Sequence, residues 1–91
     1  MKLALVGDHP DGLDIARAMA AKGRHELLVY AGPAVGAEVL QRDGLTPKRA
    51  GDLEDVLANP EVECVIVASG KASRGAMLRR AVQSERHVLC V

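Results

Sequence analysis

Two glycines near the N-terminus have the spacing of a phosphate-binding loop. The segment Gly7-Asp8-His9-Pro10-Asp11-Gly12 follows a short apolar run and precedes a helical pattern. A dinucleotide fingerprint, G-x-G-x-x-G/A, has glycine at its first and third positions and a small residue at its sixth. Gly7 and Gly12 match the outer positions, whereas His9 replaces the second glycine. The loop is therefore a candidate phosphate site, with a tight ligand-free turn as the alternative.

The side chain of His9 has a physical consequence for phosphate binding. The second glycine of the fingerprint lets the backbone approach a pyrophosphate closely, and a side chain there obstructs that approach. Asp8 and Asp11 also bring negative charge to the loop. The following helix points free N–H groups toward this site, although Asp11 is placed to cap them.

A second candidate segment, Ala68-Ser69-Gly70-Lys71-Ala72-Ser73-Arg74, follows a strongly apolar run. Ser69 and Gly70 can present a hydroxyl and a backbone N–H to a nucleotide. Lys71 and Arg74 can supply the positive charge that the first loop lacks. A plain helix N-terminus with solvated basic residues is the alternative interpretation.

The residues that usually distinguish NAD from NADP are not apparent in the sequence. An acidic residue at the end of the second strand holds the ribose hydroxyls of NAD, and a nearby arginine accommodates the 2′-phosphate of NADP. Here that strand ends with Tyr30-Ala31-Gly32-Pro33, without either residue type. Arg42 and Lys48 are too far along the chain to be assigned this role. No two of the three histidines have helical metal-ligand spacing, so no metal site is predicted.

These loops must be positioned by the elements around them, and the apolar pattern switches repeatedly between the strand and the helix period. Strands are expected at residues 2–6, 26–31, 46–50, 64–68 and 87–91, and helices at 13–22, 34–42, 52–58 and 73–84. Such alternation with right-handed crossovers predicts an α/β fold, a doubly wound, Rossmann-like parallel sheet of strand order 3-2-1-4-5. Both candidate loops then lie at carboxyl ends of strands, where ligands bind in such sheets.

The composition limits the class of protein. The 91 residues are enough for one small domain, residues 1–91, and 48% of them are hydrophobic with Tyr30 as the only aromatic. A formal net charge of zero argues against nucleic acid or an anionic membrane as the main partner. No apolar run reaches the ~20 residues that span a bilayer. Cys64 and Cys90 lie in apolar runs, where we expect two buried free thiols and a reducing, cytoplasmic location.

The last run, His87–Val91, is apolar on both faces and is expected to need a neighbour at its edge. We therefore expect a fragment of a larger two-domain protein, or one half of an assembly with homo-oligomer contacts at the last strand.

Three segments of the second half carry a family resemblance: Asp52–Val62, Cys64–Ser69 and Arg86–Cys90. They resemble the Gfo/Idh/MocA oxidoreductases, which include glucose–fructose oxidoreductase and inositol dehydrogenase. Members of that family typically show "dLeelLadpeiDaViIaTp", a helix and then "gkHVlcEKP". The similarity runs nearly end to end, and the HVLC ending at that spacing is its most specific part.

The resemblance implies a Rossmann domain that binds NAD or NADP, followed by a substrate domain that this chain lacks. It implies the cofactor-binding residues Gly7, His9, Gly12, Ser69 and Gly70, and it places Gly32 where many members have the ribose-binding Asp. The family's Glu-Lys-Pro would begin at Val91, so the lysine associated with catalysis is not in the chain. The resemblance thus implies an oxidoreductase acting on a sugar or polyol, without predicting that this chain alone is an enzyme.

Two other functions fit the same pattern. One is a non-catalytic Rossmann-like module with a degenerate nucleotide site, which acts through protein contacts on its last strand. The other is a CoA-binding domain, which shares the architecture. Fold alone does not choose between these functions.

Overall fold

A five-stranded, all-parallel sheet forms the centre of the protein in a computed structural model that describes residues 1–91. The strand order is β3-β2-β1-β4-β5, which confirms the predicted order 3-2-1-4-5. The strands are β1 (Lys2–Val6), β2 (Glu26–Ala31), β3 (Lys48–Ala50), β4 (Cys64–Val67) and β5 (His87–Cys90). The expected weak third strand is thus present, as a three-residue edge strand.

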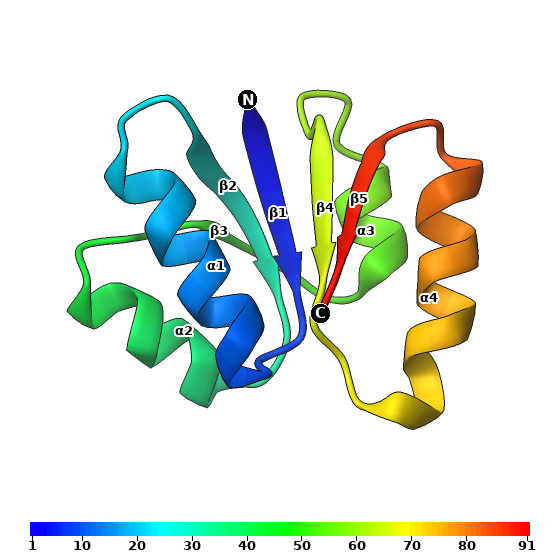
Figure 1. Ribbon diagram of the computed structural model, residues 1–91, viewed down its shortest axis with the longest axis horizontal. Helices are drawn as coiled ribbons and strands as arrows, with labels where there is room; N and C mark the ends of the chain where they lie inside the picture. Colours follow the sequence, from blue (N-terminus) through cyan, green and yellow to red (C-terminus); the bar gives the residue numbers. More distant parts are fainter.

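Two helices cover each face of the sheet (Figure 1). α1 (Pro10–Ala21) and α2 (Ala34–Arg42) pack on one face, and α3 (Leu53–Leu57) and α4 (Lys71–Gln83) pack on the other. The doubly wound α/β prediction is confirmed. No helix has both the length and the apolar character needed to cross a membrane.

Alternation along β1 explains how one sheet serves two cores. Leu3 and Leu5 point into the core under α1 and α2, whereas Ala4 and Val6 point into the core under α3 and α4. β4 is buried over all four of its residues because it has a strand on each side and a helix layer on each face. Each fully buried leucine stabilises the fold by roughly 1.5–3 kcal/mol.

The start of α1 corrects one expectation. The helix begins at Pro10, three residues before the predicted start, and His9 rather than Asp11 is its N-cap. The Nδ1 atom of His9 accepts the Asp11 N–H at 3.1 Å. Proline favours this start because its ring presets the helical φ and it has no N–H to leave unpaired.

The last strand corrects another expectation. Cys64 is a buried free thiol as predicted, but Cys90 is exposed. β5 is an edge strand that α4 covers on one face only, so Val88 packs into the core while Leu89 stays 41% exposed. The opposite face of β5 has no helix, which exposes Leu89. Cys90 points to the same face as Val88 and is exposed at the end of this edge strand.

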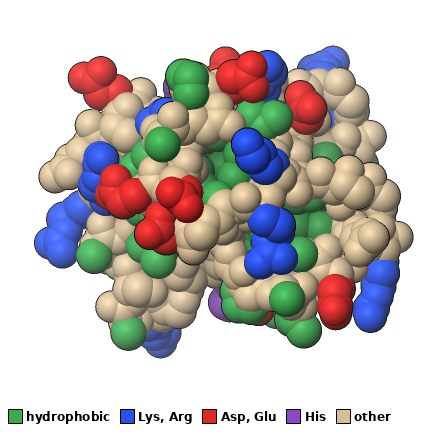
Figure 2. Space-filling model, turned by 180° about the vertical axis from the view of Figure 1, so that it is seen from behind, with side chains coloured by type: hydrophobic (Ala, Val, Ile, Leu, Met, Phe, Trp, Pro, Cys, Tyr) green, Lys and Arg blue, Asp and Glu red, His purple; other side chains and the backbone are tan.

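The surface seen from behind mixes both signs of charge (Figure 2). Lys and Arg side chains and Asp and Glu side chains both occur on this face in small groups, and hydrophobic side chains show between them. One ion pair links the two helices of one layer, because the guanidinium of Arg80 on α4 contacts the carboxylate of Glu54 on α3 at 2.7 Å.

Candidate functional site

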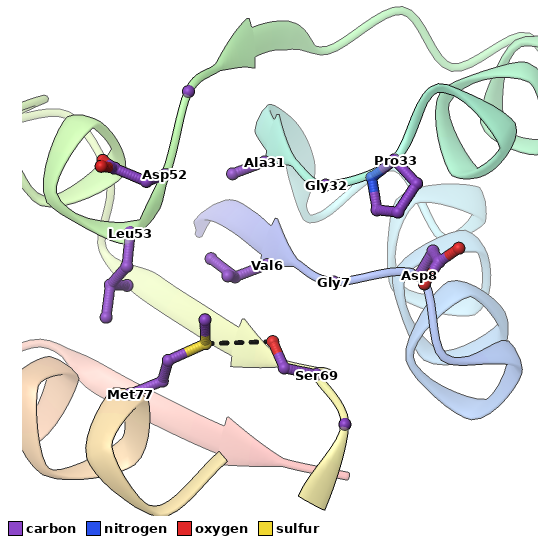
Figure 3. Close-up of a pocket in the computed structure, with 12 residues that line it drawn as sticks. Val6, Gly7, Asp8, Ala31, Gly32, Pro33, Asp52, Leu53, Ser69 and Met77 are labelled. Atoms are coloured by element: carbon purple, nitrogen blue, oxygen red, sulfur yellow. Dashed lines mark hydrogen bonds between the residues drawn. The ribbon is translucent and has the colours of Figure 1, made fainter. Parts of the chain in front are cut away.

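A cavity of about 320 Å³ lies across the carboxyl ends of β2, β1 and β4 (Figure 3). This is the topological switch point, because the chain runs from β1 outward to β2 and β3 and then returns to β4 on the other side. The strand ends, the start of α3 and one side chain of α4 form its walls. The lining residues used below are Gly7, Asp8, Gly32, Asp52, Ser69 and Gly70.

Gly7 turns the chain sharply at the end of β1. Its φ is +97°, and a Cβ there would overlap the carbonyl oxygen of Ala68. Its N–H donates to the carbonyl of Ala31 at 2.8 Å, which ties the turn to the end of β2. A side chain at this position would separate β1 from β4, so the first glycine of the fingerprint has the role expected for it.

Gly12 serves the packing of α1 on the sheet. It is buried, and a Cβ there would overlap the Cβ of Ala68. Both fingerprint glycines therefore pack against Ala68. The carbonyl of Ala68 also accepts the His9 N–H at 3.1 Å. The only sign of this role in the sequence is that Ala68 is a small residue directly after a strongly apolar strand.

The first turn of α1 has few donors left for a phosphate. Pro10 has no N–H, and the Asp11 N–H is bound to the imidazole of His9. The Gly12 N–H donates to the carbonyl of His9 at 2.9 Å. The groups that usually hold a pyrophosphate at this helix end are thus absent or occupied.

The first turn of α4, unlike that of α1, has backbone N–H groups that are free to bind a ligand. Its N-cap is Gly70, which offers no side-chain hydrogen bond, so the N–H groups of Lys71 and Ala72 have no intrahelical partner. The Ser69 hydroxyl donates to the sulfur of Met77 at 3.0 Å and keeps its oxygen as an acceptor (Figure 3). The expected contribution of Arg74 is not seen here, because its guanidinium donates to the carbonyl of Val91 at 3.0 Å.

Tyr30 is the structural support of the β2–α2 turn. It is fully buried, and its hydroxyl donates to the carbonyl of Pro33 at 2.8 Å. Gly32 and Gly36 leave the room that this hydroxyl occupies. Burial raises the pKa of Tyr30, the negative charge of Asp8 raises it further, and a nearby arginine opposes the effect.

That arginine is Arg49, which β3 brings to the end of β2. It pairs in register with Tyr30, and its guanidinium carbon lies 5.4 Å from the centre of the tyrosine ring. One guanidinium nitrogen donates to the carbonyl of Gly32 at 2.8 Å. The sequence alone does not indicate this role for Arg49, because only the strand register brings residue 49 beside residue 30.

Asp52 is a third residue whose place at the site does not follow from the sequence. It caps α3 by accepting the Asp55 N–H at 2.9 Å, as predicted, and it also lines the cavity. With Asp8, it brings a second carboxylate to the cavity wall.

The structure brings together three of the five predicted site residues. Gly7, Ser69 and Gly70 line the cavity. His9 lines a neighbouring hollow of about 570 Å³ beside α2, and Gly12 lies buried beneath α1.

No protein-family model matches the sequence, and no curated protein matches it. Solved structures do match its fold. The myo-inositol dehydrogenase of Lactobacillus casei, in complex with NAD(H) and myo-inositol, superposes with a TM-score of 0.85 at 18% identity over 99% of this chain and 27% of its own. GenD2 from gentamicin A biosynthesis, in complex with NAD, has a TM-score of 0.85 at 25% identity over 99% of this chain and 26% of its own.

A third neighbour is the biliverdin reductase of a Synechocystis species, in complex with biliverdin and NADP⁺. Its TM-score is 0.75 at 22% identity over 98% of this chain and 28% of its own. These neighbours include Gfo/Idh/MocA-type NAD-binding oxidoreductases. The chain covers their N-terminal domain and spans about a quarter of their length.

The residues present fit a dinucleotide at most points of this site. The cavity crosses the strand ends where such a cofactor lies in this fold, and Gly7 and Gly12 perform the packing roles of fingerprint glycines. The open N–H groups at the start of α4 suit an anion. The departure is at α1, where His9 caps the helix in the place of a phosphate contact.

Proposed function

We propose that this chain is the NAD(P)-binding domain of a Gfo/Idh/MocA-like oxidoreductase that acts on a sugar or polyol. The observation that carries the proposal is the cavity across the ends of β2, β1 and β4, walled by the two predicted loops. A bound nicotinamide dinucleotide would supply hydride transfer, and the share of this domain is to bind and orient it. The neighbours that bind NAD(H) or NADP⁺ support this reading.

The cofactor contacts divide between the two loops. The tight turn at Gly7 allows a ligand to pass over the end of β1, and Gly70 is open because a Cβ there would meet nothing within 4 Å. Ser69 offers a hydroxyl oxygen beside it. His9 is a neighbour of the cofactor in this arrangement rather than a phosphate ligand.

The residues that bind the substrate and the catalytic groups would belong to a second domain. The neighbours are about four times as long as the part that this chain covers, and their additional length supports such a partner domain. The exposed side chains Leu89 on β5 and Val82 on α4 offer apolar area for its contact, and a second copy of the chain is the other occupant to consider.

The occupied first turn of α1 favours one competing function. With Pro10 lacking an N–H and the Asp11 N–H bound to His9, the domain resembles a Rossmann-like module that has lost its nucleotide. Such a module would act through protein contacts alone. A CoA-binding domain has no specific observation in its favour, but coenzyme A serves as a useful comparison ligand.

Backbone amide NMR on the domain distinguishes these functions. NAD⁺, NADP⁺ and coenzyme A are titrated separately, and the proposal expects saturable shifts at Gly7–Gly12 and at Ser69–Lys71 with a nicotinamide nucleotide only. Gly70→Val should weaken binding because its side chain would enter the cavity. The same substitution at Gly75, which is exposed on α4 and does not line the cavity, should leave binding unchanged.

If the amides do not shift at millimolar nucleotide in a folded sample, the cofactor proposal fails and the non-catalytic module becomes the better account. Saturation by coenzyme A alone would favour the CoA-binding domain instead.

A further inference from the structure

Packing explains why the end of β2 has no acidic side chain. A Cβ at Gly32 would lie 2.6 Å from the Tyr30 hydroxyl. The Tyr30 side chain cannot move aside, because it is fully buried and its hydroxyl donates a hydrogen bond to the carbonyl of Pro33. A carboxylate that holds the ribose hydroxyls of NAD therefore has no room at this position.

Arg49 places a cation at the same strand end. Its guanidinium donates to the Gly32 carbonyl at 2.8 Å, and Gly32 itself lines the cavity. No carboxylate is paired with Arg49 in an ion pair. A guanidinium has five N–H donors, and the bond to Gly32 uses one of them. The side chain is exposed, so an anion can reach the remaining donors.

The start of α2 adds donors beside this cation. Its N-cap is Pro33, which makes no side-chain cap, so the N–H groups of Ala34 and Val35 have no intrahelical partner. The positive end of this helix follows directly after Gly32 in the chain. An anion at the end of β2 would thus meet both a guanidinium and open amides.

Two carboxylates of the cavity wall oppose an anion. Asp8 raises the pKa of Tyr30 and Arg49 lowers it, so a negative and a positive charge both lie near the Tyr30 ring. Asp52 lies at the end of β3, where one of its oxygens caps α3. Asp52 is therefore the competing candidate for contacting an unphosphorylated ribose.

From this arrangement we propose that the site selects NADP over NAD, with Arg49 as the residue that binds the 2′-phosphate of the adenosine ribose. This inference rests on the proposed function and specifies its cofactor. A guanidinium matches phosphate oxygens in a two-point contact, which a neutral ribose hydroxyl cannot replace. The register of β3 against β2 places Arg49 beside Tyr30, just outside the cavity lining. From there its guanidinium reaches the carbonyl of Gly32, at the strand end where the fold otherwise uses an acid.

Isothermal titration of the folded domain tests the proposal with two pairs of ligands. Each pair differs only by the 2′-phosphate: NADP⁺ against NAD⁺, and 2′,5′-ADP against 5′-ADP. We expect the phosphorylated member of each pair to bind roughly tenfold more tightly or better. In Arg49→Gln this preference should disappear while the affinity for NAD⁺ is retained, and Arg49→Lys should restore part of it.

Lys48→Gln is the matched control, because it removes a positive charge from the neighbouring residue of the same strand and should keep the preference. Asp52→Asn keeps an N-cap side chain for α3 but removes a carboxylate that repels the phosphate, so the preference should persist or increase. If NAD⁺ binds to the unaltered domain as tightly as NADP⁺ or more tightly, the inference on cofactor choice is wrong, although the proposed function still stands. The inference is also wrong if Asp52→Asn abolishes NAD⁺ binding and Arg49→Gln has no effect. If neither dinucleotide binds, the proposed function itself fails.

Discussion

Tyr30 shows how a single side chain determines the chemistry of its surroundings. Its hydroxyl fills the space beneath the β2–α2 turn, which requires glycine at position 32 and so removes the usual place for a ribose-binding acid. The same burial raises the pKa of its hydroxyl, with Asp8 adding to the effect. A packing residue of the core thereby influences which ligand the neighbouring cavity can hold.

We predict that Tyr30 makes the fold sensitive to alkaline pH. An unfolded tyrosine ionises near pH ~10, whereas the folded protein retains the proton to higher pH. Between the two pKa values the unfolded state binds fewer protons, so stability falls as pH rises. The contribution is complete below about pH 10 and is lost as the pH rises through the folded pKa.

Urea unfolding at neutral and at alkaline pH measures this effect in the unaltered protein and in Tyr30→Phe. The free energy of unfolding should fall less with pH in Tyr30→Phe. Burial also raises the pKa of Cys64, with the same sign of pH dependence, but Cys64 is common to both proteins and cancels in the comparison. Identical pH profiles would contradict the role of Tyr30.

Helix and strand elements meet at the switch point through small residues. α1 reaches the sheet because Gly12 lies directly against Ala68, and β1 turns beneath the same residue at Gly7. The boundaries of most elements were predicted to within two residues from the apolar pattern. The start of α1 was not, because the proline and the histidine cap act locally and leave no trace in the apolar period.

We predict opposite effects of alanine at two helical glycines. Gly12→Ala on α1 should destabilise the domain by about 1–3 kcal/mol, because the added methyl overlaps Ala68 and must displace the helix. Gly75→Ala on α4 should stabilise it by about 0.5–1 kcal/mol, because the methyl meets nothing and the unfolded chain loses freedom. Chemical denaturation of both variants gives the two differences, and equal effects would show that α1 does not depend on this contact.

The whole molecule is one sheet shared by two cores, and this predicts that it unfolds as one unit. Val65 and Ile66 are neighbours on β4, yet they point into opposite cores. A defect in one core therefore strains the strand that also supports the other. Small single domains of this size usually unfold in one cooperative step.

Val65→Ala tests this coupling across the sheet. It lies in the core under α3 and α4, whereas Tyr30, the only aromatic residue, lies in the core under α1 and α2. We expect the free energy of unfolding to fall by roughly 1–3 kcal/mol. The unfolding midpoints followed by Tyr30 fluorescence and by far-UV circular dichroism should shift by the same amount. A fluorescence midpoint that stays unchanged would mean that the two cores unfold separately.

The sequence alone determined the fold class, the strand order and the two loops at the switch point. It could do so because apolar period, glycine position and short connections are local features that act along the chain. Only the tertiary structure showed that His9 is hydrogen-bonded to an amide in the first turn of α1 and that Gly7 and Gly12 both pack against Ala68. It also showed that Arg49 on β3 lies at the end of β2. These facts depend on strand register and on close packing between segments distant in sequence, which the order of residues does not display.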